Sequence, residues 1–246
     1  MKVIFLDLDK TLLGDDYSPE PAGEAVREFK KGGFKIVFNS SKTRREQEYY
    51  RKALGIEEPF IVENGSAIFI PKGYFPFEFA CSMEDDQYKI IELGERYEVI
   101  KAALDEISDE FGLKYYGNST LNEIMEFTGL PRRLAELARE RDYSETVFKW
   151  EKGGFEEVLR RRFEVSRGSR FWSVHGKTDK GKAAKMLLNL YSKLGELESY
   201  AVGDGLNDFP MFDVVDFAFI VGELKHPKAR NISSVEEITL DNVKVK

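Results

Sequence analysis

The sequence is poor in the residues on which disulfide and soft-metal chemistry depend. Its 246 residues include one cysteine, Cys81, and two histidines, His175 and His226. A single cysteine excludes an internal disulfide and a cysteine-based zinc site, and two histidines are too few for a histidine-rich metal centre. A bound metal ion would therefore be held mainly by carboxylate oxygens, which suits Mg²⁺.

Long hydrophobic runs are also absent. The longest apolar stretches have about 6 to 8 residues, whereas a membrane-spanning helix needs roughly 20. The N-terminal apolar run over 3–6 is interrupted at once by Asp7, which excludes a secretory signal. We expect a cytoplasmic protein that does not contact the membrane.

A surplus of basic residues is missing too. Lysine and arginine number 37 against 44 acidic residues, which gives a net charge of −7. This balance argues against a general nucleic-acid binder, which needs cations to replace the counterions of the phosphates. Glutamine occurs only at positions 47 and 87 while Glu, Lys and Arg are abundant, a composition typical of thermophilic proteins.

Strand and helix patterns alternate at both ends of the chain, which predicts an α/β fold with a Rossmann-like parallel sheet and helices on both faces. In the first part, the patterns predict strands over 2–7, 34–38 and 59–62, a helix over 21–31, a helix from the capping box 43–46 to about residue 55, and a hairpin through 64–65 into 67–70. In the last part, they predict strands over 171–175, 199–203 and 217–221, and a helix over 179–194.

The middle of the chain has a different pattern. It predicts helices over 95–111 and 131–141 and short strands over 113–116, 146–150 and 162–166, which is an α+β arrangement. We therefore expect a discontinuous core domain of residues 1–80 and 171–246, interrupted by an inserted domain of residues 81–170.

Two acidic motifs follow predicted strands. Asp7 and Asp9 come directly after the first strand, and Asp204 and Asp208 follow the strand over 199–203. Close carboxylates repel one another, and a divalent cation at the carboxyl edge of an open α/β sheet would compensate that repulsion. The alternatives are a solvated acidic turn at the first motif and a Gly/Asn/Asp turn before a capped helix at the second.

Three further polar residues are candidate phosphate ligands at the same sheet edge. Ser40 ends the second strand, Lys180 begins a helix, and Asn207 lies between the acids of the second acidic motif. A hydroxyl, an ammonium and an amide can bind phosphate oxygens, and helix N-termini attract anions. Ordinary helix capping and surface decoration are the alternatives for Ser40 and Lys180.

Taken together, these motifs match in order and type the haloacid dehalogenase (HAD) phosphohydrolase superfamily, which the chain resembles over 1–70 and 171–221. The insertion is similar to the type C2B cap of the Cof-like type IIB members. The resemblance implies a Mg²⁺-dependent phosphatase that forms an aspartyl-phosphate on Asp7, with Asp9 as the general acid and base. It also implies metal binding by Asp7, Asp9, Asp204 and Asp208, and phosphate binding by Ser40, Lys180 and Asn207.

A finer resemblance concerns the substrate. The run 40–44 (Ser-Ser-Lys-Thr-Arg) replaces the Thr-Gly-Arg of most Cof-like members, and 63–65 (Glu-Asn-Gly) follows it. Both look like the mannosyl-3-phosphoglycerate phosphatase family, which implies a small phosphorylated sugar-glycerate substrate and mannosylglycerate, a compatible solute, as product. A substrate of this kind carries a carboxylate, for which Arg167, Ser169 and Arg170 are candidate ligands. The alternative is that these residues form the surface of a domain linker.

Other functions remain open at this point. Phosphatases for sucrose phosphate or trehalose phosphate and phosphomannomutases share this core and cap type. A non-catalytic phosphate-binding or metal-binding regulator on the same fold is a further alternative. The oligomeric state is left open by the sequence.

Overall fold

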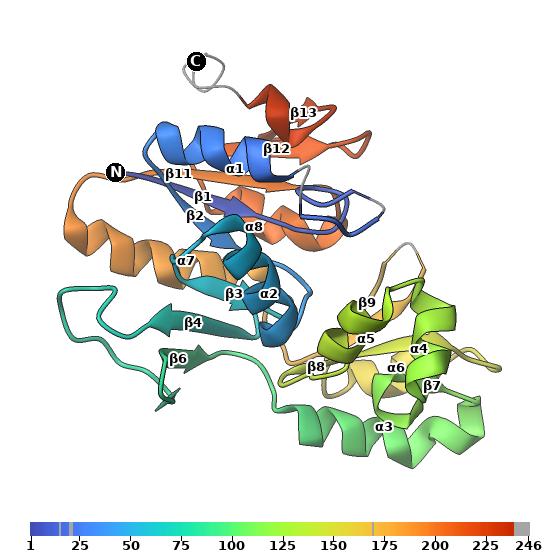
Figure 1. The fold of residues 1–246 in the computed structure, drawn as a ribbon. Helices are drawn as coiled ribbons and strands as arrows, with labels where there is room; N and C mark the ends of the chain where they lie inside the picture. Colours follow the sequence, from blue (N-terminus) through green and yellow to red (C-terminus); the bar gives the residue numbers. More distant parts are fainter. Residues whose placement is uncertain (15, 20–21, 169, 239–246) are drawn as a thin grey trace.

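The computed structural model describes residues 1–14, 16–19, 22–168 and 170–238. The chain forms two lobes (Figure 1). The first and last parts of the sequence build the larger lobe, and the middle of the sequence builds the smaller one, coloured green to yellow. We call them the core and the cap.

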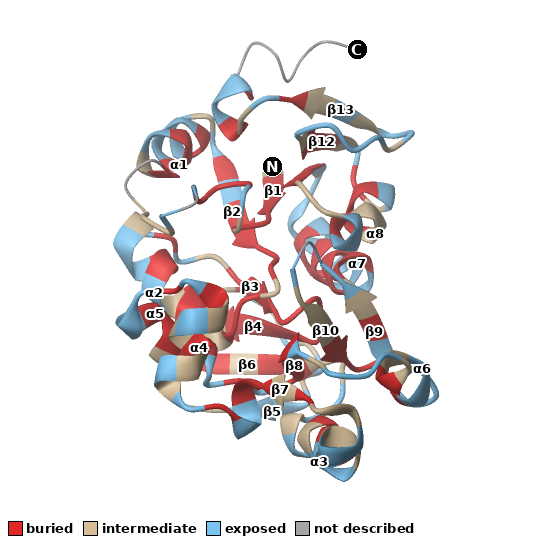
Figure 2. Cartoon of the chain, turned by 90° about the vertical axis from the view of Figure 1, so that its right-hand side faces the viewer, coloured by how far each residue is buried: buried red, intermediate tan, exposed pale blue. Residues whose placement is uncertain are grey.

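The core contains a five-stranded sheet in the order β13-β12-β11-β1-β2, and all four strand pairings are parallel. Its strands are β1 (Lys2–Leu6), β2 (Phe34–Phe38), β11 (Glu198–Gly203), β12 (Phe217–Val221) and β13 (Ala229–Ile232). Because β1 lies inside the sheet between β11 and β2, its apolar run is buried on both faces, and residues 3–6 are fully inaccessible (Figure 2). The α/β prediction with a parallel sheet is confirmed.

Helices cover both faces of this sheet. They are α1 (Ala22–Lys31), α2 (Arg44–Leu54), α7 (Lys180–Tyr191) and α8 (Phe209–Asp213). Ile4 belongs to the apolar cluster that includes α1 and α2, whereas its neighbour Phe5 belongs to the cluster that includes α7 and α8. Successive side chains of β1 therefore pack against the helix layers on opposite faces of the sheet, as the two-residue period of a strand requires.

Several predicted boundaries are confirmed. Helix α2 begins at a complete capping box between Thr43 and Glu46 and ends at Gly55, whose backbone is left-handed. The helix predicted over 21–31 is observed from Ala22, and position 21 lies outside the described residues. No helix among the described residues has both the length and the apolar character needed to cross a bilayer.

A second, antiparallel sheet lies in the core with the order β3-β4-β6-β5. Its strands are β3 (Phe60–Val62), β4 (Ala67–Pro71), β5 (Met83–Glu84) and β6 (Tyr88–Glu92). The predicted hairpin joins β3 to β4, and a parallel bridge from Asn39 to Ile61 connects β3 to the end of β2. The second sheet therefore continues from the edge of the parallel sheet.

The cap contains an antiparallel sheet in the order β7-β8-β10-β9. Its strands are β7 (Lys114–Tyr115), β8 (Ser144–Lys149), β9 (Glu164–Arg167) and β10 (Trp172–His175), and its helices are α3 (Tyr97–Phe111), α4 (Leu121–Thr128), α5 (Arg132–Ala138) and α6 (Phe155–Arg160). Apolar residues of α3 and α6 pack on one face of this sheet. The mixture of helices and antiparallel strands agrees with the α+β expectation for the insertion.

The sheets divide the chain at positions that differ from the expected 80/81 and 170/171. Strand β6 pairs with β4 of the core, whereas β10 pairs with β8 and β9 of the cap. The sequence pattern of a short strand predicts its extended backbone but not its partner. We therefore propose that the cap comprises residues 93–176, and we use the word in this sense below.

Candidate active site

Strand β1 delivers Asp7 to the carboxyl edge of the parallel sheet. The backbone N–H of Asp7 donates to the carbonyl of Val202 at 3.0 Å, so that the ladder with β11 continues one residue beyond β1. The Asp7 side chain is buried, with 6% of the residue exposed. The following loop returns Thr11 to the site, where its hydroxyl lies 3.5 Å from Asp204 Oδ1.

Strand β11 ends at Gly203 and places the second pair of acids beside Asp7. A Cβ atom on Gly203 would stand 2.3 Å from Cγ of Asp208, so only glycine permits this approach. One oxygen of the fully buried Asp208 accepts the backbone N–H groups of Asp204 and Gly205 at 3.0 and 2.9 Å. The turn that follows β11 thereby fixes the orientation of the Asp208 carboxylate.

Asp7, Asp204 and Asp208 form a three-carboxylate cluster, in which one oxygen of each lies within 4.8 Å of the others. Burial raises the pKa of Asp7 to about 7, and the neighbouring Asp208 and Asp204 carboxylates add to this shift. Burial likewise raises the pKa of Asp204. Three carboxylates that repel one another and offer hard oxygen ligands are suited to a divalent cation. The predicted meeting of Asp7 with Asp204 and Asp208 is thus observed.

Lys180 joins this cluster from the first turn of α7. Its ammonium nitrogen lies 2.7 Å from Asp7 Oδ1 and 2.5 Å from Asp208 Oδ1, and only 1% of the residue is exposed. Although burial opposes the charge, the Asp208 and Asp7 carboxylates raise the pKa of Lys180 above its usual value. Lys182, by contrast, is exposed, and its nitrogen donates to the carbonyl of Lys177. Of these two lysines, it is therefore Lys180, the candidate named from the sequence, that contacts the cluster.

Gly65 sets the position from which Lys180 starts. The hairpin turn between β3 and β4 passes so close to α7 that a Cβ atom on Gly65 would lie 2.1 Å from the carbonyl oxygen of Asp179. The Thr178 hydroxyl donates to the Gly65 carbonyl at 3.1 Å, and the Asp179 side chain caps α7. The turn and the helix start therefore form one rigid contact.

The Asp9 carboxylate lies outside the three-carboxylate cluster. Its Oδ1 is 2.9 Å from the nitrogen of Lys42, which also lies 3.3 Å from Glu46. Lys42 is buried, with its nitrogen over the ring of Tyr17, and the Asp9 and Glu46 carboxylates raise its pKa against the effect of burial. The sequence assigned no role to Lys42, although the Ser-Ser-Lys-Thr run that contains it was available as a signal.

Ser40 and Asn207 occupy the same sheet edge. The backbone N–H of Asn39 donates to the carbonyl of Leu6 at 2.9 Å, so the β1–β2 ladder continues one residue beyond β2. Ser40 is the next residue, and it is fully buried. The exposed Asn207 donates its amide to Oδ1 of Asn64 at 3.1 Å. Their roles as phosphate ligands stay predictions.

The residues 63–64 connect this edge to the cap, a role that the sequence did not reveal. Both have left-handed backbones, with φ of 48° at Glu63 and 61° at Asn64. Asn64 donates to the hydroxyl of Ser173 on β10 at 3.2 Å. The buried Glu63 carboxylate accepts the hydroxyl of Ser144 at 2.5 Å and two backbone N–H groups of 142–143 at 2.9 and 3.2 Å. This turn is therefore a principal contact between core and cap.

The predicted carboxylate ligands of the cap make other contacts. The guanidinium of Arg167 lies 5.5 Å from the ring centre of Trp172, and Arg170 donates to the carbonyls of Phe127 and Thr128 at the end of α4. Ser169 lies outside the described residues. Among the described residues, these two arginines contact other parts of the cap and not the three-carboxylate cluster.

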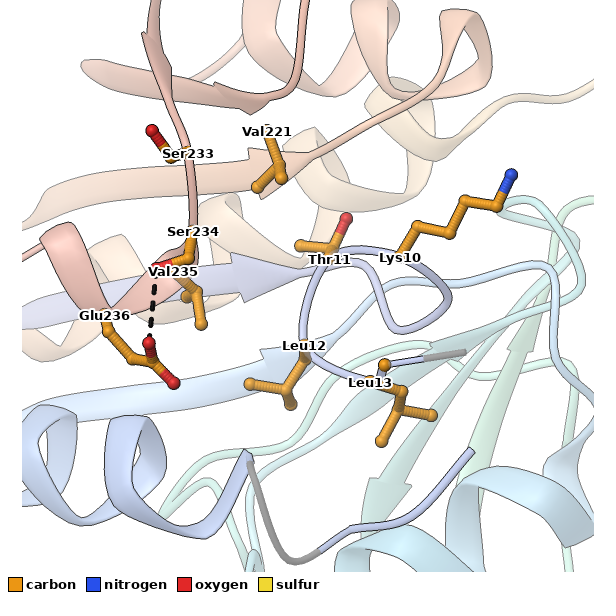
Figure 3. Close-up of a pocket in the computed structure, with 10 residues that line it drawn as sticks. Lys10, Thr11, Leu12, Leu13, Val221, Ser233, Ser234, Val235 and Glu236 are labelled. Carbon is orange, nitrogen blue, oxygen red and sulfur yellow. Dashed lines mark hydrogen bonds between the residues drawn. The ribbon is translucent and has the colours of Figure 1, made fainter. Parts of the chain in front are cut away.

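A pocket of about 340 Å³ opens beside the loop that follows Asp9 (Figure 3). It is lined by residues 10–14, Val221 and 233–236, and Ser234 donates to Glu236 at 3.3 Å within it. The pocket therefore neighbours the acidic loop, but its lining includes none of the three clustered carboxylates.

Comparisons with known proteins agree with this architecture. A family profile described as haloacid dehalogenase-like hydrolase matches residues 4–242. The chain is 59% identical to a mannosyl-3-phosphoglycerate phosphatase of Pyrococcus furiosus over 97% of this chain and 98% of the relative. It is 41% identical to a glucosyl-3-phosphoglycerate/mannosyl-3-phosphoglycerate phosphatase of Persephonella marina, over 89% of this chain and 84% of the relative.

Solved structures resemble the fold at lower identity. A haloacid dehalogenase-like hydrolase from Bacteroides thetaiotaomicron superposes with a TM-score of 0.67 at 17% identity, covering 98% of this chain and 97% of its own. A HAD subclass IIB sugar phosphatase gives a TM-score of 0.64 at 19% identity, covering 99% of this chain and 97% of its own. These structures support the same arrangement of core and cap.

Proposed function

The chain belongs to the haloacid dehalogenase-like hydrolase family, and from this membership we propose that it is the phosphatase that converts mannosyl-3-phosphoglycerate to mannosylglycerate and phosphate. The observation that carries the proposal is the three-carboxylate cluster around Lys180, in a chain 59% identical to a phosphatase of that name. The sequence-based expectation of a cytoplasmic enzyme stays part of the proposal.

Mg²⁺ fits the cluster, because Asp7, Asp204 and Asp208 offer oxygen atoms within 4.8 Å of one another and no softer donor belongs to this set. The backbone carbonyl of Asp9 would complete the protein ligands. When bound, the ion would reduce the repulsion between an anionic nucleophile and an anionic ester.

Asp7 acts as the nucleophile in this proposal. Lys180 holds one of its carboxylate oxygens, and the other attacks phosphorus in line with the departing oxygen. The bond between phosphorus and the glycerate oxygen breaks as the aspartyl-phosphate forms. Ser40, Asn207 and Lys180 would hold the equatorial phosphate oxygens, on which the transition-state charge gathers.

Asp9 then serves both proton transfers. Its carboxylate stands apart from the three-carboxylate cluster and is 38% exposed, so it can reach the solvent and the leaving group. It donates a proton to the departing glycerate oxygen and next removes a proton from the water that attacks the aspartyl-phosphate. Phosphate leaves and the Asp7 carboxylate is restored, so protons and bonds balance over the cycle.

A second candidate substrate is glucosyl-3-phosphoglycerate, because the Persephonella relative carries that compound in its name. Both substrates have the same phosphoglycerate portion and differ only in the sugar. The active-site carboxylates and Lys180 cannot distinguish them, since these groups meet the phosphate.

The test is phosphate release from purified protein with mannosyl- and glucosyl-3-phosphoglycerate, sucrose phosphate, trehalose phosphate and mannose phosphates, with Mg²⁺ or with a chelator. We expect release from a glycosyl phosphoglycerate only with the metal. Asp7→Asn should abolish turnover, while Asp109→Asn on the exposed side of α3 should retain it. Beryllium fluoride with Mg²⁺ should bind at Asp7 as a mimic of the aspartyl-phosphate. Normal turnover of the Asp7→Asn protein, or hexose phosphate isomerised without phosphate release, refutes the proposal.

A further inference from the structure

The cap sheet has one covered face and one face that meets the core. On the covered face, Val147 of β8, Val174 of β10 and Val165 of β9 pack in one apolar cluster with residues of α3 and α6. Side chains alternate along each strand, so the neighbouring positions on these strands point to the other face.

That other face carries three hydroxyls side by side. In the register of the sheet, Ser173 of β10 lies opposite Thr146 of β8 and opposite Ser166 of β9. We call these residues the hydroxyl row. All three have intermediate exposure. Among the described residues, no protein partner is found for the hydroxyls of Thr146 and Ser166, which leaves them able to bind a ligand.

Ser173 shows that the hydroxyl row faces the candidate active site. Its hydroxyl accepts the amide of Asn64 at 3.2 Å, and Asn64 accepts the amide of Asn207 at 3.1 Å. Asn207 precedes Asp208, whose carboxylate binds Lys180. Two hydrogen bonds thus separate the row from the turn that completes the three-carboxylate cluster.

The neighbouring positions on the same face define the limits of the row. On one side, Ser144 is bound to Glu63 and fixes the sheet on the core, and its register neighbours across the sheet are His175 and the exposed Glu164. On the other side, Phe148 and Phe171 meet edge to face at 5.4 Å, and Phe127 stacks on Phe148. A ligand above the row therefore meets neutral hydroxyls in the middle and, at one end, the partly exposed rings of Phe127 and Phe171, which pack on the buried Phe148.

This combination suits a sugar. Hydroxyl groups donate and accept hydrogen bonds with other hydroxyls, and aromatic rings pack against apolar ring faces. The row contains no cation, and Arg167, two residues from Val165 on the strand, is directed to the Trp172 ring on the covered face. The row is therefore suited to a neutral polyhydroxylated group and not to a carboxylate.

We propose that Thr146, Ser166 and Ser173 bind the hydroxyls of the glycosyl portion of the substrate and so determine its sugar specificity. The inference rests on the proposed function, in which a glycosyl phosphoglycerate places its phosphate at Asp7. The phosphate and the sugar are then recognised by different lobes, the first by the core and the second by the cap.

Thr146→Val and Ser166→Ala, alone and combined, test the proposal because each removes a hydroxyl with little change in volume. Each protein is assayed with mannosyl-3-phosphoglycerate and with p-nitrophenyl phosphate, which has no sugar. The ratio of kcat/KM between the two substrates should fall about fivefold to tenfold per hydroxyl, mainly through KM. Ser108→Ala is the matched control, since Ser108 lies in the cap on α3 and its hydroxyl bonds to the Asp105 carbonyl.

Binding of mannosylglycerate, measured by calorimetry, gives a readout that needs no turnover. The combined variant should bind it about thirtyfold or more weakly than the parent, and Ser108→Ala should bind it within twofold of the parent. An unchanged dissociation constant in the combined variant overturns the assignment, as does an equal loss of kcat/KM with both phosphate substrates. If the parent releases no phosphate from either compound, the proposed function fails, while the calorimetric result still decides the role of the hydroxyl row.

Discussion

Replacing Gly65 with alanine should damage both stability and activity, because this residue lies against the start of α7. Gly65 has a φ of +87°, and an added Cβ would stand 2.1 Å from the carbonyl oxygen of Asp179 and 2.8 Å from the backbone nitrogen of Lys180. Ordinary contacts between such atoms are about 3.5 Å. The obstacle is backbone, which cannot rotate aside, so the first turn of α7 must move by about 1 Å.

The expected cost has two parts. A left-handed backbone costs alanine about 1–2 kcal/mol, and forcing packed atoms apart costs about 1–3 kcal/mol more. The free energy of unfolding of Gly65→Ala should therefore fall by about 2–5 kcal/mol. Gly73→Ala is the matched control, because Gly73 has a φ of +78° and a Cβ there would meet nothing within 4 Å. It should lose only the conformational part, about 1–2 kcal/mol.

Guanidinium unfolding followed by circular dichroism measures the stabilities, and phosphate release measures the activity. Because Lys180 moves with the helix start, kcat/KM of Gly65→Ala should fall about 100-fold, as expected for a displacement of about 1 Å at a catalytic group. Gly73→Ala should keep its activity. If the two variants are equally stable and equally active, the contact between the turn and α7 does not position Lys180, and the reasoning is refuted.

Three further predictions concern the acids around the site. Glu63→Gln should lose about 2 kcal/mol of stability, since an amide has only one acceptor oxygen for the donors of 142–144. The control is Glu140→Gln, at an exposed residue that is also at the core–cap contact. It should lose less than about 0.5 kcal/mol in the same unfolding assay. Asp9→Asn should slow phosphate release by about 100-fold to 10,000-fold while the protein stays folded, and turnover at the parent rate would contradict its role in proton transfer. Burial raises the pKa of Asp7 from 3.8 to about 7, so between these pH values the folded protein binds a proton that the unfolded chain does not. In a chelator, which keeps the site free of metal, the parent should therefore lose stability as pH rises through this range. The decline in the guanidinium midpoint should be smaller in Asp7→Asn, in which the raised pKa of Asp204 remains, and a decline of the same size in both proteins would refute the assignment.

Local signals were sufficient to predict the three-carboxylate cluster. Asp7 and Asp204 each follow an apolar run that is buried as a parallel strand, and parallel strands bring their carboxyl ends to one edge. Lys180 follows a helix cap, so its place at that edge is also set by nearby sequence. These residues could be predicted because strand order and helix start fix them.

Contacts between distant segments could not be predicted in this way. Asn64 meets Ser173 and Asn207, which are 109 and 143 positions away, and nothing in the local pattern of a hairpin turn indicates such partners. The pairing of β10 with the cap was missed for the same reason. The hydroxyl row depends on sheet register, which is a property of three strands together.

The charge of a side chain did not by itself predict which residues contact the site. Arg167 and Arg170 were chosen because a carboxylate needs a cation, but the structure shows Arg167 over an indole and Arg170 on the carbonyls that end α4. Both partners are common for arginine and leave no sequence signal. Their role in carboxylate binding stays a prediction, and Lys42 beside Asp9 is the buried cation that charge alone did not distinguish.

The position of β1 between β11 and β2 affects the order in which a newly made chain can fold. Lys2 pairs with Phe34 on one side and with Glu198 on the other, so β1 can pair early with β2 but must wait for β11, nearly two hundred residues later. The antiparallel sheet of 114–175 has all its strands available earlier. During synthesis, the cap is therefore complete before the nucleophilic aspartate acquires its acidic neighbours, and phosphatase chemistry cannot begin until the chain has been translated past Asp208.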